Sequence, residues 1–200
     1  MGMFDLRDRL KGKRVVLASA SPRRKELLAY ITDEFEVQPA YGEEIIPAGF
    51  TGFFVPIELA EQKCREVVER CQPDDDTIVI GCDTAVIYNN VIYGKPKNAA
   101  DAKRMLTELS GNTHFVSSGL CVYYRGKYRK NLSTASVVFN ELSEADINAY
   151  IATGEPMDKA GSYGIQGLGG LMVKKIVGDY YSIVGLPLNL LAVMLNEVLS

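Results

Sequence analysis

The chain has 200 residues, of which 47% are hydrophobic and 24% charged, and its formal net charge is −3. This balance is typical of a globular protein with one substantial core or two small lobes. It argues against a nucleic-acid partner, which usually requires a basic surface. No segment approaches the roughly 18 consecutive apolar residues that a membrane helix needs. Charged residues near the N-terminus stand where a signal peptide has its apolar segment, so we expect no export, no membrane partner and a cytoplasmic location.

The first part of the chain alternates short apolar runs with a helical pattern. Strands are predicted at 13–19 and 35–40, with a helix over 21–31 between them. Ser21 is the expected N-cap of this helix, because serine commonly precedes a proline in the first turn.

The next segments predict a loop, a helix and a pair of strands. Residues 41–54 contain Gly and Pro without a clean period, which indicates a loop. Apolar side chains at helical spacing predict an amphipathic helix over 55–71. An apolar run over 77–83 predicts a buried strand that ends at Asp83, followed by a second extended run, a turn at Asn89–Asn90 and another short strand.

The second half continues the alternation. Helices are predicted over 98–111, 143–154 and 188–199, and strands on both sides of a turn at 125–126 and around 171–176. The alternation of strands and helices predicts an α/β fold with a mixed sheet.

Two arginines, Arg23 and Arg24, lie in the first turn of a predicted helix, where positive charge is locally unfavourable. They either extend into solvent or help the helix start hold a phosphate, together with the hydroxyls of Ser19 and Ser21. The residues alone leave both interpretations open.

Other candidates are individually ambiguous. Asp83, after a buried strand, either caps a turn or binds a metal, whereas Glu44, Lys63 and Lys95 taken singly are solvated charges. Gln166 lies in the stretch GIQGLGG and either contacts a base edge or satisfies a turn. Together, these cations and carboxylates suit a metal-assisted phosphate enzyme.

The cysteines and the histidine give no competing chemistry. No C-x-x-C pair occurs and the chain has one histidine, which argues against a zinc site. We expect structural roles for His114 and for the four cysteines, Cys64, Cys71, Cys82 and Cys121.

The candidate residues fall in motifs that resemble the Maf family of nucleoside triphosphate pyrophosphatases. The match runs from about Arg14 to Leu195 and includes, in order, LASASPRRKELL, LAEQK, VIGCDTAV, GKP, AKRMLTELSGNTH, TGEPMDKAGSYGIQG and DYYSIVGLPL. The resemblance implies a single domain over 1–200, with an elongated mixed α/β sheet in two lobes and a central cleft.

The resemblance also implies an activity and a set of site residues. The activity is hydrolysis of a nucleoside triphosphate to the monophosphate and pyrophosphate with Mg²⁺ or Mn²⁺. Asp83 would be the catalytic residue, and Asp83 and Glu44 the metal ligands. The implied substrate-binding residues are Ser19, Ser21, Arg23, Arg24, Lys63, Lys95 and Gln166.

The stretch AGSYGIQG resembles the branch that acts on dTTP and UTP, and modified pyrimidine nucleotides are further candidate substrates. Two alternatives stay open: a pyrophosphatase for 7-methyl-GTP or another noncanonical nucleotide, and a non-catalytic nucleotide-binding regulator of cell division. The second is motivated by Tyr41 and Gly42, which stand where the family usually has acidic residues. The family often forms homodimers, so the resemblance also implies a homodimer.

Overall fold

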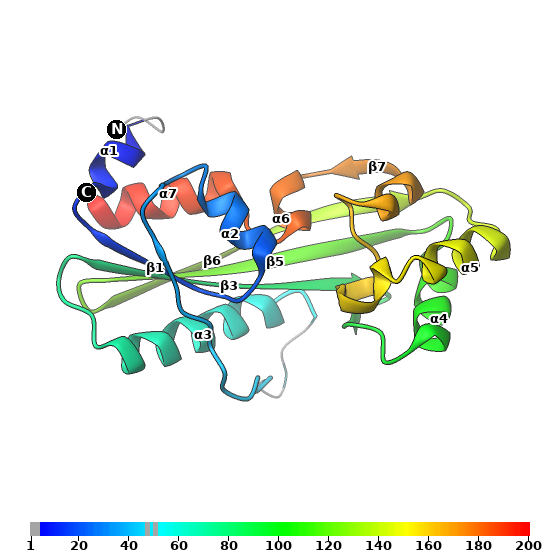
Figure 1. Cartoon of the computed structure of the whole chain (residues 1–200), viewed down its shortest axis with the longest axis horizontal. Coiled ribbons are helices and arrows are strands. Elements are labelled where there is room, and N and C mark those ends of the chain that lie inside the picture. Colours follow the sequence, from blue (N-terminus) through cyan, green and yellow to red (C-terminus); the bar gives the residue numbers. More distant parts are fainter. Residues whose placement is uncertain (1–4, 47–48, 50–51) are drawn as a thin grey trace.

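The computed structural model describes residues 5–46, 49 and 52–200 (Figure 1). In this part of the chain, seven strands form one mixed sheet in the order β2-β1-β3-β5-β6-β7, with β4 paired to β3. The strands are β1 (Arg14–Ala18), β2 (Glu36–Val37), β3 (Thr77–Tyr88), β4 (Val91–Tyr93), β5 (Thr113–Tyr124), β6 (Lys127–Phe139) and β7 (Val173–Val177). The two pairings of β1 are parallel and the others antiparallel, so the predicted mixed sheet is confirmed.

The helices cover the sheet in two groups. The α-helices are α1 (Leu6–Leu10), α2 (Pro22–Leu28), α3 (Val55–Cys71), α4 (Ala99–Leu109), α5 (Glu144–Ala152), α6 (Tyr180–Val184) and α7 (Leu188–Leu199). Short 3-10 segments are found at Glu155–Asp158, Ala160–Ser162 and Leu168–Met172. In Figure 1, α2 and α7 lie on one side of the sheet and α3 on the other, while α4 and α5 cover its far end. No helix among the described residues is both long and apolar enough to cross a membrane.

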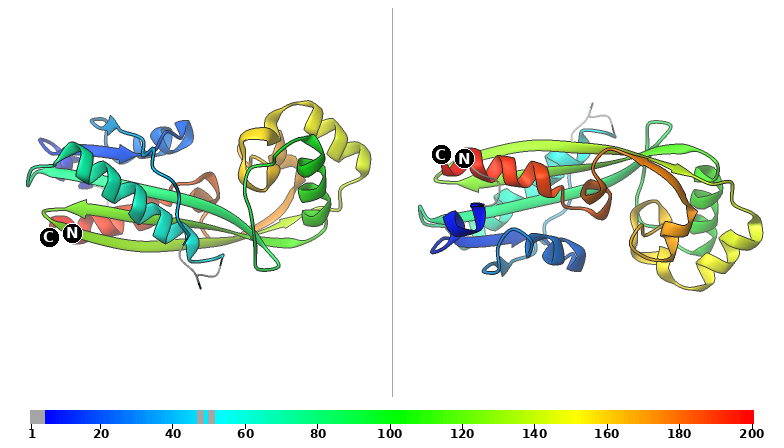
Figure 2. Two further views of the ribbon diagram at one scale, coloured as in Figure 1. Left: turned by 90° about the horizontal axis from the view of Figure 1, so that it is seen from below. Right: turned by 90° about the horizontal axis from the view of Figure 1, so that it is seen from above.

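The molecule is elongated, with a lobe at each end of the long strands β3, β5 and β6 (Figure 2). In the first lobe, alternate side chains of β1 enter two different cores. Val15 and Leu17 pack with α2 and α7, whereas Val16 and Ala18 pack with α3. A third core joins α4 and α5 in the second lobe. Because successive side chains of a strand point to opposite faces, these two cores lie on the two faces of the sheet, and each is covered by its own helices.

Strand β3 continues beyond the end that the sequence predicts. The prediction of a strand ending at Asp83 is wrong, because the strand extends to Tyr88. The parallel partner β1 stops at the pair Ala18–Gly81, but antiparallel pairing with β5 continues to Ile87–Phe115. Asp83 therefore lies within β3, just past the point where β1 leaves the sheet. The two five-residue helices α1 and α6 were also absent from the sequence prediction.

His114 has the structural role expected of it. It lies at the start of β5, is fully buried, and its Nε2 is 2.8 Å from the Tyr163 hydroxyl. Its ring also packs edge to face against Phe139. Burial lowers the pKa of His114 to about 4, so the imidazole is neutral at pH 7.

Two glycines allow α3 to lie very close to the sheet. A Cβ built on Gly81 would fall 2.2 Å from the Ala60 carbonyl oxygen, and one on Gly119 would fall 2.4 Å from the Pro56 carbonyl oxygen. Gly119 is the cross-strand partner of Asp83. The absence of side chains at these two positions therefore sets the distance between α3 and the strand that carries Asp83.

Replacing Gly119 by alanine should lower the free energy of unfolding by about 1–3 kcal/mol, because the new methyl group overlaps the backbone of α3. The measurement is urea unfolding followed by circular dichroism. Gly94→Ala is the matched control, since a Cβ there meets nothing within 4 Å. Equal midpoints for the two variants would show that the close approach of α3 does not depend on Gly119.

Candidate active site

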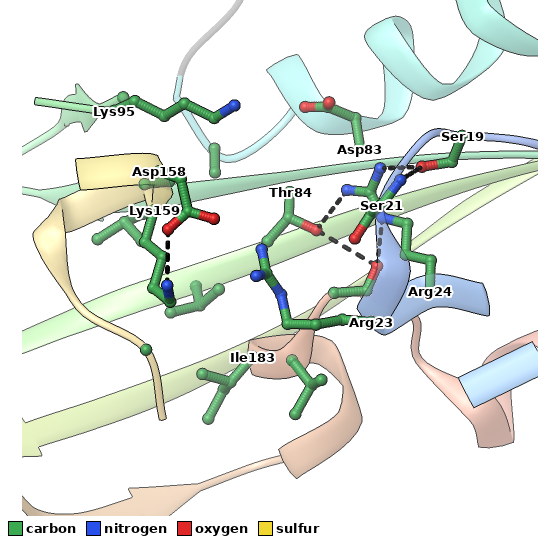
Figure 3. Close-up of a pocket in the computed structure, with 18 of the residues that line it drawn as sticks. Ser19, Ser21, Arg23, Arg24, Asp83, Thr84, Lys95, Asp158, Lys159 and Ile183 are labelled. Carbon is green, nitrogen blue, oxygen red and sulfur yellow. Dashed lines mark hydrogen bonds and ion pairs between the residues drawn. The ribbon is translucent and has the colours of Figure 1, made fainter. Parts of the chain in front are cut away.

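A cleft of about 1080 Å³ lies between the two lobes. Its volume is at the upper end of the range found for small-molecule sites. All the site residues predicted from the sequence line this one cleft: Ser19, Ser21, Arg23, Arg24, Glu44, Lys63, Asp83, Lys95 and Gln166. The cleft thus gathers residues from α2, α3, β3 and four loops. Figure 3 shows six of them: Ser19, Ser21, Arg23, Arg24, Asp83 and Lys95.

Arg24 joins three elements at one end of the cleft. Its Nη1 donates to the Ser19 hydroxyl (3.1 Å), its Nη2 to the Thr84 hydroxyl (3.1 Å) and its Nε to the Gly185 carbonyl oxygen (2.9 Å). Gly185 ends α6 with a φ of 123°, a conformation that favours glycine. Arg24 therefore fixes the β1–α2 turn against β3 and α6.

Ser21 occupies the predicted N-cap position of α2, but its side chain makes no capping hydrogen bond. Its backbone N–H donates instead to the Ser19 hydroxyl at 3.2 Å. Arg23 donates no hydrogen bond to any of the described residues, and Figure 3 shows its side chain extending into the cleft. The two neighbouring arginines thus differ: Arg24 is engaged with protein groups, while Arg23 is available to a ligand.

Two carboxylates in the cleft, those of Asp83 and Glu44, lie close to one ammonium group, that of Lys63. The Nζ of Lys63, on α3, is 2.5 Å from Asp83 Oδ1 and 2.8 Å from Glu44 Oε1. The side chains of Lys63 and Asp83 are 19% and 13% exposed, compared with 55% for Glu44. The predicted partner Glu44 is therefore beside Asp83, although Tyr41 and Gly42 interrupt the acidic pattern before it.

The electrostatics of this group follow from burial and from the ion pairs. Burial raises the pKa of Asp83, and the nearby charges of Lys63 and Arg24 oppose that effect. Burial works against the charged form of Lys63, but the carboxylates of Asp83 and Glu44 outweigh it and raise the pKa of Lys63. A carboxylate with a raised pKa accepts a proton more readily than an exposed aspartate does.

Asp83 and Glu44 have the carboxylate chemistry that a divalent metal such as Mg²⁺ prefers. Mg²⁺ commonly binds through one or two carboxylates and takes phosphate oxygens and water as its other ligands. Asp83 and Glu44 already converge on a single cation, the Lys63 ammonium. Over residues 5–46, 49 and 52–200, no group of three or more His, Cys, Asp or Glu side chains is arranged to hold a metal. Asp83 and Glu44 could hold Mg²⁺ or Mn²⁺ as two carboxylate ligands, with water or phosphate oxygens as the other ligands.

The second lobe contributes further polar groups that the sequence-based assignment did not include. Glu155, Asp158 and Lys159 line the cleft opposite Arg23. The Nζ of Lys159 donates to Asp158 Oδ1 (2.7 Å) and to the Glu155 carbonyl oxygen (2.8 Å). These residues belong to the motif TGEPMDKAGSYGIQG, so the signal that could have identified them was present in the sequence.

The loop that carries Gln166 is built around Glu155. The carboxylate accepts hydrogen bonds from the Leu168 and Gly169 N–H groups at 2.9 and 3.1 Å and from the Tyr150 hydroxyl at 2.9 Å. A Cβ on Gly167 would fall 2.5 Å from this carboxylate. The glycines of GIQGLGG therefore allow the loop to close around Glu155, with Gln166 exposed at the cleft.

Comparison with known proteins gives the family. The family model of the Maf-like proteins matches residues 14–198, so the chain belongs to the Maf family. A dTTP/UTP pyrophosphatase of Clostridium botulinum (strain Okra / Type B1) is 46% identical over 189 residues, covering 93% of this chain and 97% of that protein. One from Bacillus cytotoxicus is 48% identical, covering 88% of this chain and 91% of that protein.

A solved structure supports the fold. The Staphylococcus aureus Ham1 protein superposes with a TM-score of 0.50 at 14% identity, covering 92% of this chain and 99% of that one. At this identity the likeness extends to the fold alone, and it confirms the predicted elongated α/β architecture.

The different environments of the two arginines lead to a prediction. Arg24→Lys removes the planar group that reaches Ser19, Thr84 and Gly185 together, so it should lower the free energy of unfolding by about 1–3 kcal/mol. Arg23→Lys, which disrupts no hydrogen bond within the described residues, should change it by less than about 0.5 kcal/mol. Chemical denaturation of both variants measures the difference. A larger loss of unfolding free energy for Arg23→Lys than for Arg24→Lys would contradict the structural role of Arg24.

Proposed function

We propose that this chain is a metal-dependent nucleoside triphosphate pyrophosphatase that converts dTTP and UTP to the monophosphate and pyrophosphate. The observation that carries the proposal is the convergence of Asp83 and Glu44 on one cation position, in a cleft that also contains Arg23 and Lys95. The substrate follows from the dTTP/UTP pyrophosphatases that are 46–48% identical over most of the chain.

The charges of the cleft suit a bound triphosphate. Arg23 and Lys95 approach from opposite lobes, and Figure 3 shows both side chains directed toward the space between them. Their positive charges neutralise phosphate oxygens and stabilise the charge that develops on the departing pyrophosphate. Arg24 orders the turn that presents Ser19 and Ser21 to the same ligand.

Asp83 is the general base of the proposed mechanism. Its buried carboxylate accepts a proton from the water that attacks the α-phosphorus. Asp83 and Glu44 would also hold the divalent metal, which supplies charge stabilisation at the phosphate oxygens. Lys63 keeps the two carboxylates close to each other through its ion pairs.

Gln166 is the proposed contact for the base. Its amide offers both a donor and an acceptor, which can pair with the edge of thymine or uracil. The residue lies on the exposed turn of the loop that surrounds Glu155, and it lines the cleft. The 7-methyl-GTP alternative has no observation in the cleft that favours it over pyrimidine substrates.

Substrate choice is tested with a panel of dTTP, UTP, CTP, GTP, 7-methyl-GTP and ITP. Pyrophosphate release should require Mg²⁺ or Mn²⁺ and should be at least about tenfold faster from dTTP and UTP, because one well-placed polar contact discriminates by this amount or more. Release from 7-methyl-GTP or ITP alone would contradict the substrate assignment. Nucleotide binding without release from any of them would favour the regulator hypothesis.

The role of Asp83 is tested by Asp83→Asn, which is nearly isosteric and should retain the fold. Loss of the base should reduce kcat by about 10²–10⁴-fold. Asp75→Asn, in the exposed turn before β3, is the matched control and should retain wild-type turnover. If Asp83→Asn keeps full turnover with Mg²⁺, Asp83 is not the general base.

A further inference from the structure

The loop after β2 is attached to α3 along one stripe of that helix. Gln62, Glu66 and Arg70 are four residues apart, so their side chains lie on the same face. Each of them bonds to the backbone of the segment from residue 39 to residue 46, here called the 39–46 segment. Glu44 belongs to this segment.

Glu66 forms the central attachment. Its Oε1 accepts the Tyr41 N–H at 2.8 Å and its Oε2 accepts the Gly42 N–H at 2.9 Å. These backbone donors lower the pKa of Glu66, with the Tyr41 N–H contributing most. Hydrogen bonds to an ionised acceptor are about twice as strong as neutral ones. The carboxylate therefore fixes two consecutive peptide groups just before Glu44.

Arg70 supports the same attachment. Its Nη1 donates to Glu66 Oε1 at 3.1 Å and its Nη2 to the Pro39 carbonyl oxygen at 2.8 Å. Its guanidinium also lies 5.5 Å from the centroid of the Tyr41 ring. Tyr41, which departs from the acidic pattern of the family, thus has a partner on α3.

Gln62 holds the segment on the other side of Glu44. Its Oε1 accepts the Ile45 N–H at 3.1 Å, and its Nε2 donates to the Ile45 carbonyl oxygen at 2.5 Å. Glu44 therefore lies between two fixed points, Gly42 and Ile45. Lys63 follows Gln62 in α3, and its ammonium nitrogen lies 2.8 Å from the Glu44 carboxylate.

The absence of a side chain at Gly42 leaves room for the Glu66 carboxylate beside the backbone. A Cβ at this position would fall 3.0 Å from Glu66 Oε2, closer than ordinary van der Waals contact. A side chain there would require the Glu66 carboxylate to shift by a few tenths of an ångström, which would lengthen its hydrogen bond to the Gly42 N–H. The departure from the family pattern at Tyr41 and Gly42 therefore coincides with the place where Glu66 approaches the backbone.

We infer that Glu66 and Gln62 are positioning residues that hold Glu44 in place as the second carboxylate of the metal site. This inference rests on the proposed function, since it takes Glu44 and Asp83 as metal ligands. A carboxylate on an exposed loop would lose conformational freedom when it binds a metal, and fixing the loop beforehand removes that cost. Groups that orient metal ligands commonly change metal affinity by 10–100-fold when they are replaced.

The test measures Mn²⁺ binding to the full chain without nucleotide, from the electron paramagnetic resonance signal of free Mn²⁺. Glu66→Ala should raise the Kd for Mn²⁺ by about tenfold. Glu69→Ala is the matched control: it removes the same charge from the same helix, and Glu69 has no hydrogen bond or ion pair with the described residues. Glu44→Ala should weaken Mn²⁺ binding at least as much as Glu66→Ala.

One further variant and one kinetic measurement complete the test. Gly42→Ala should weaken Mn²⁺ binding in the same direction while leaving the thermal midpoint within a few degrees of wild type. With dTTP, Glu66→Ala should raise the Mn²⁺ concentration needed for half-maximal pyrophosphate release and recover near wild-type kcat at saturating Mn²⁺.

Equal Mn²⁺ affinities for wild type, Glu66→Ala and Glu69→Ala would overturn the inference, as would Mn²⁺ binding that does not depend on Glu44. Absence of Mn²⁺ binding by the wild type would overturn it too. Because binding is measured without turnover, failure of the proposed function would be seen separately: wild type would bind Mn²⁺ with the expected pattern and still release no pyrophosphate.

Discussion

The ion pairs of one lysine organise the cleft. Lys63 binds Asp83 from the sheet and Glu44 from a loop, at 2.5 and 2.8 Å, in a largely buried position. Two carboxylates brought together in a low-dielectric environment repel each other unless a cation lies between them. The Lys63 ammonium supplies that cation, and its position depends on how closely α3 approaches β3. Gly81 and Gly119 permit that approach, because any side chain at either position would collide with the helix backbone.

Strand β3 connects the two halves of the cleft. Strand β5 pairs with β3 along most of its length. The first part of β3 also pairs with β1 in the first lobe, and its last residues pair with β4 toward the second lobe. Asp83 and Thr84 lie just past the end of β1, and their side chains point to opposite faces of the sheet. Asp83 contacts Lys63 of α3, and Thr84 contacts Arg24 of α2. The hairpin to β4 then leads to the loop with Lys95, which faces Arg23 across the cleft. One long strand thus carries both the proposed base and the connection to Lys95, the lysine proposed to bind phosphate.

The sequence predicted elements well where local patterns decide the structure. The helix over 55–71 was predicted with the observed ends, because its apolar spacing is regular and Pro56 marks its first turn. The strand end at Asp83 was predicted wrongly, since the continuation of β3 depends on β5, which is more than 25 residues away in the sequence. The helices α1 and α6 span five residues each, too short for a periodic pattern to be recognised.

The candidate site shows a similar division. The residues taken individually left each role open. Together they suited a metal-assisted phosphate enzyme, and the resemblance to the Maf family gave each one a role. All of them line one cleft in the structure. The attachment of Glu44 by Gln62 and Glu66 was not foreseen, because it joins a loop without regular structure to side chains about 20 residues later. The homodimer and the cytoplasmic location stay predictions.

In the proposed mechanism, a water molecule beside Asp83 attacks the α-phosphorus of the bound nucleotide. The most direct measurement is hydrolysis of dTTP in water enriched in ¹⁸O, followed by mass spectrometry of both products. Attack of water at the α-phosphorus should place one ¹⁸O atom in the thymidine monophosphate and none in the pyrophosphate. Label in the pyrophosphate would mean attack at the β-phosphorus, and it would contradict the proposed arrangement of substrate and base.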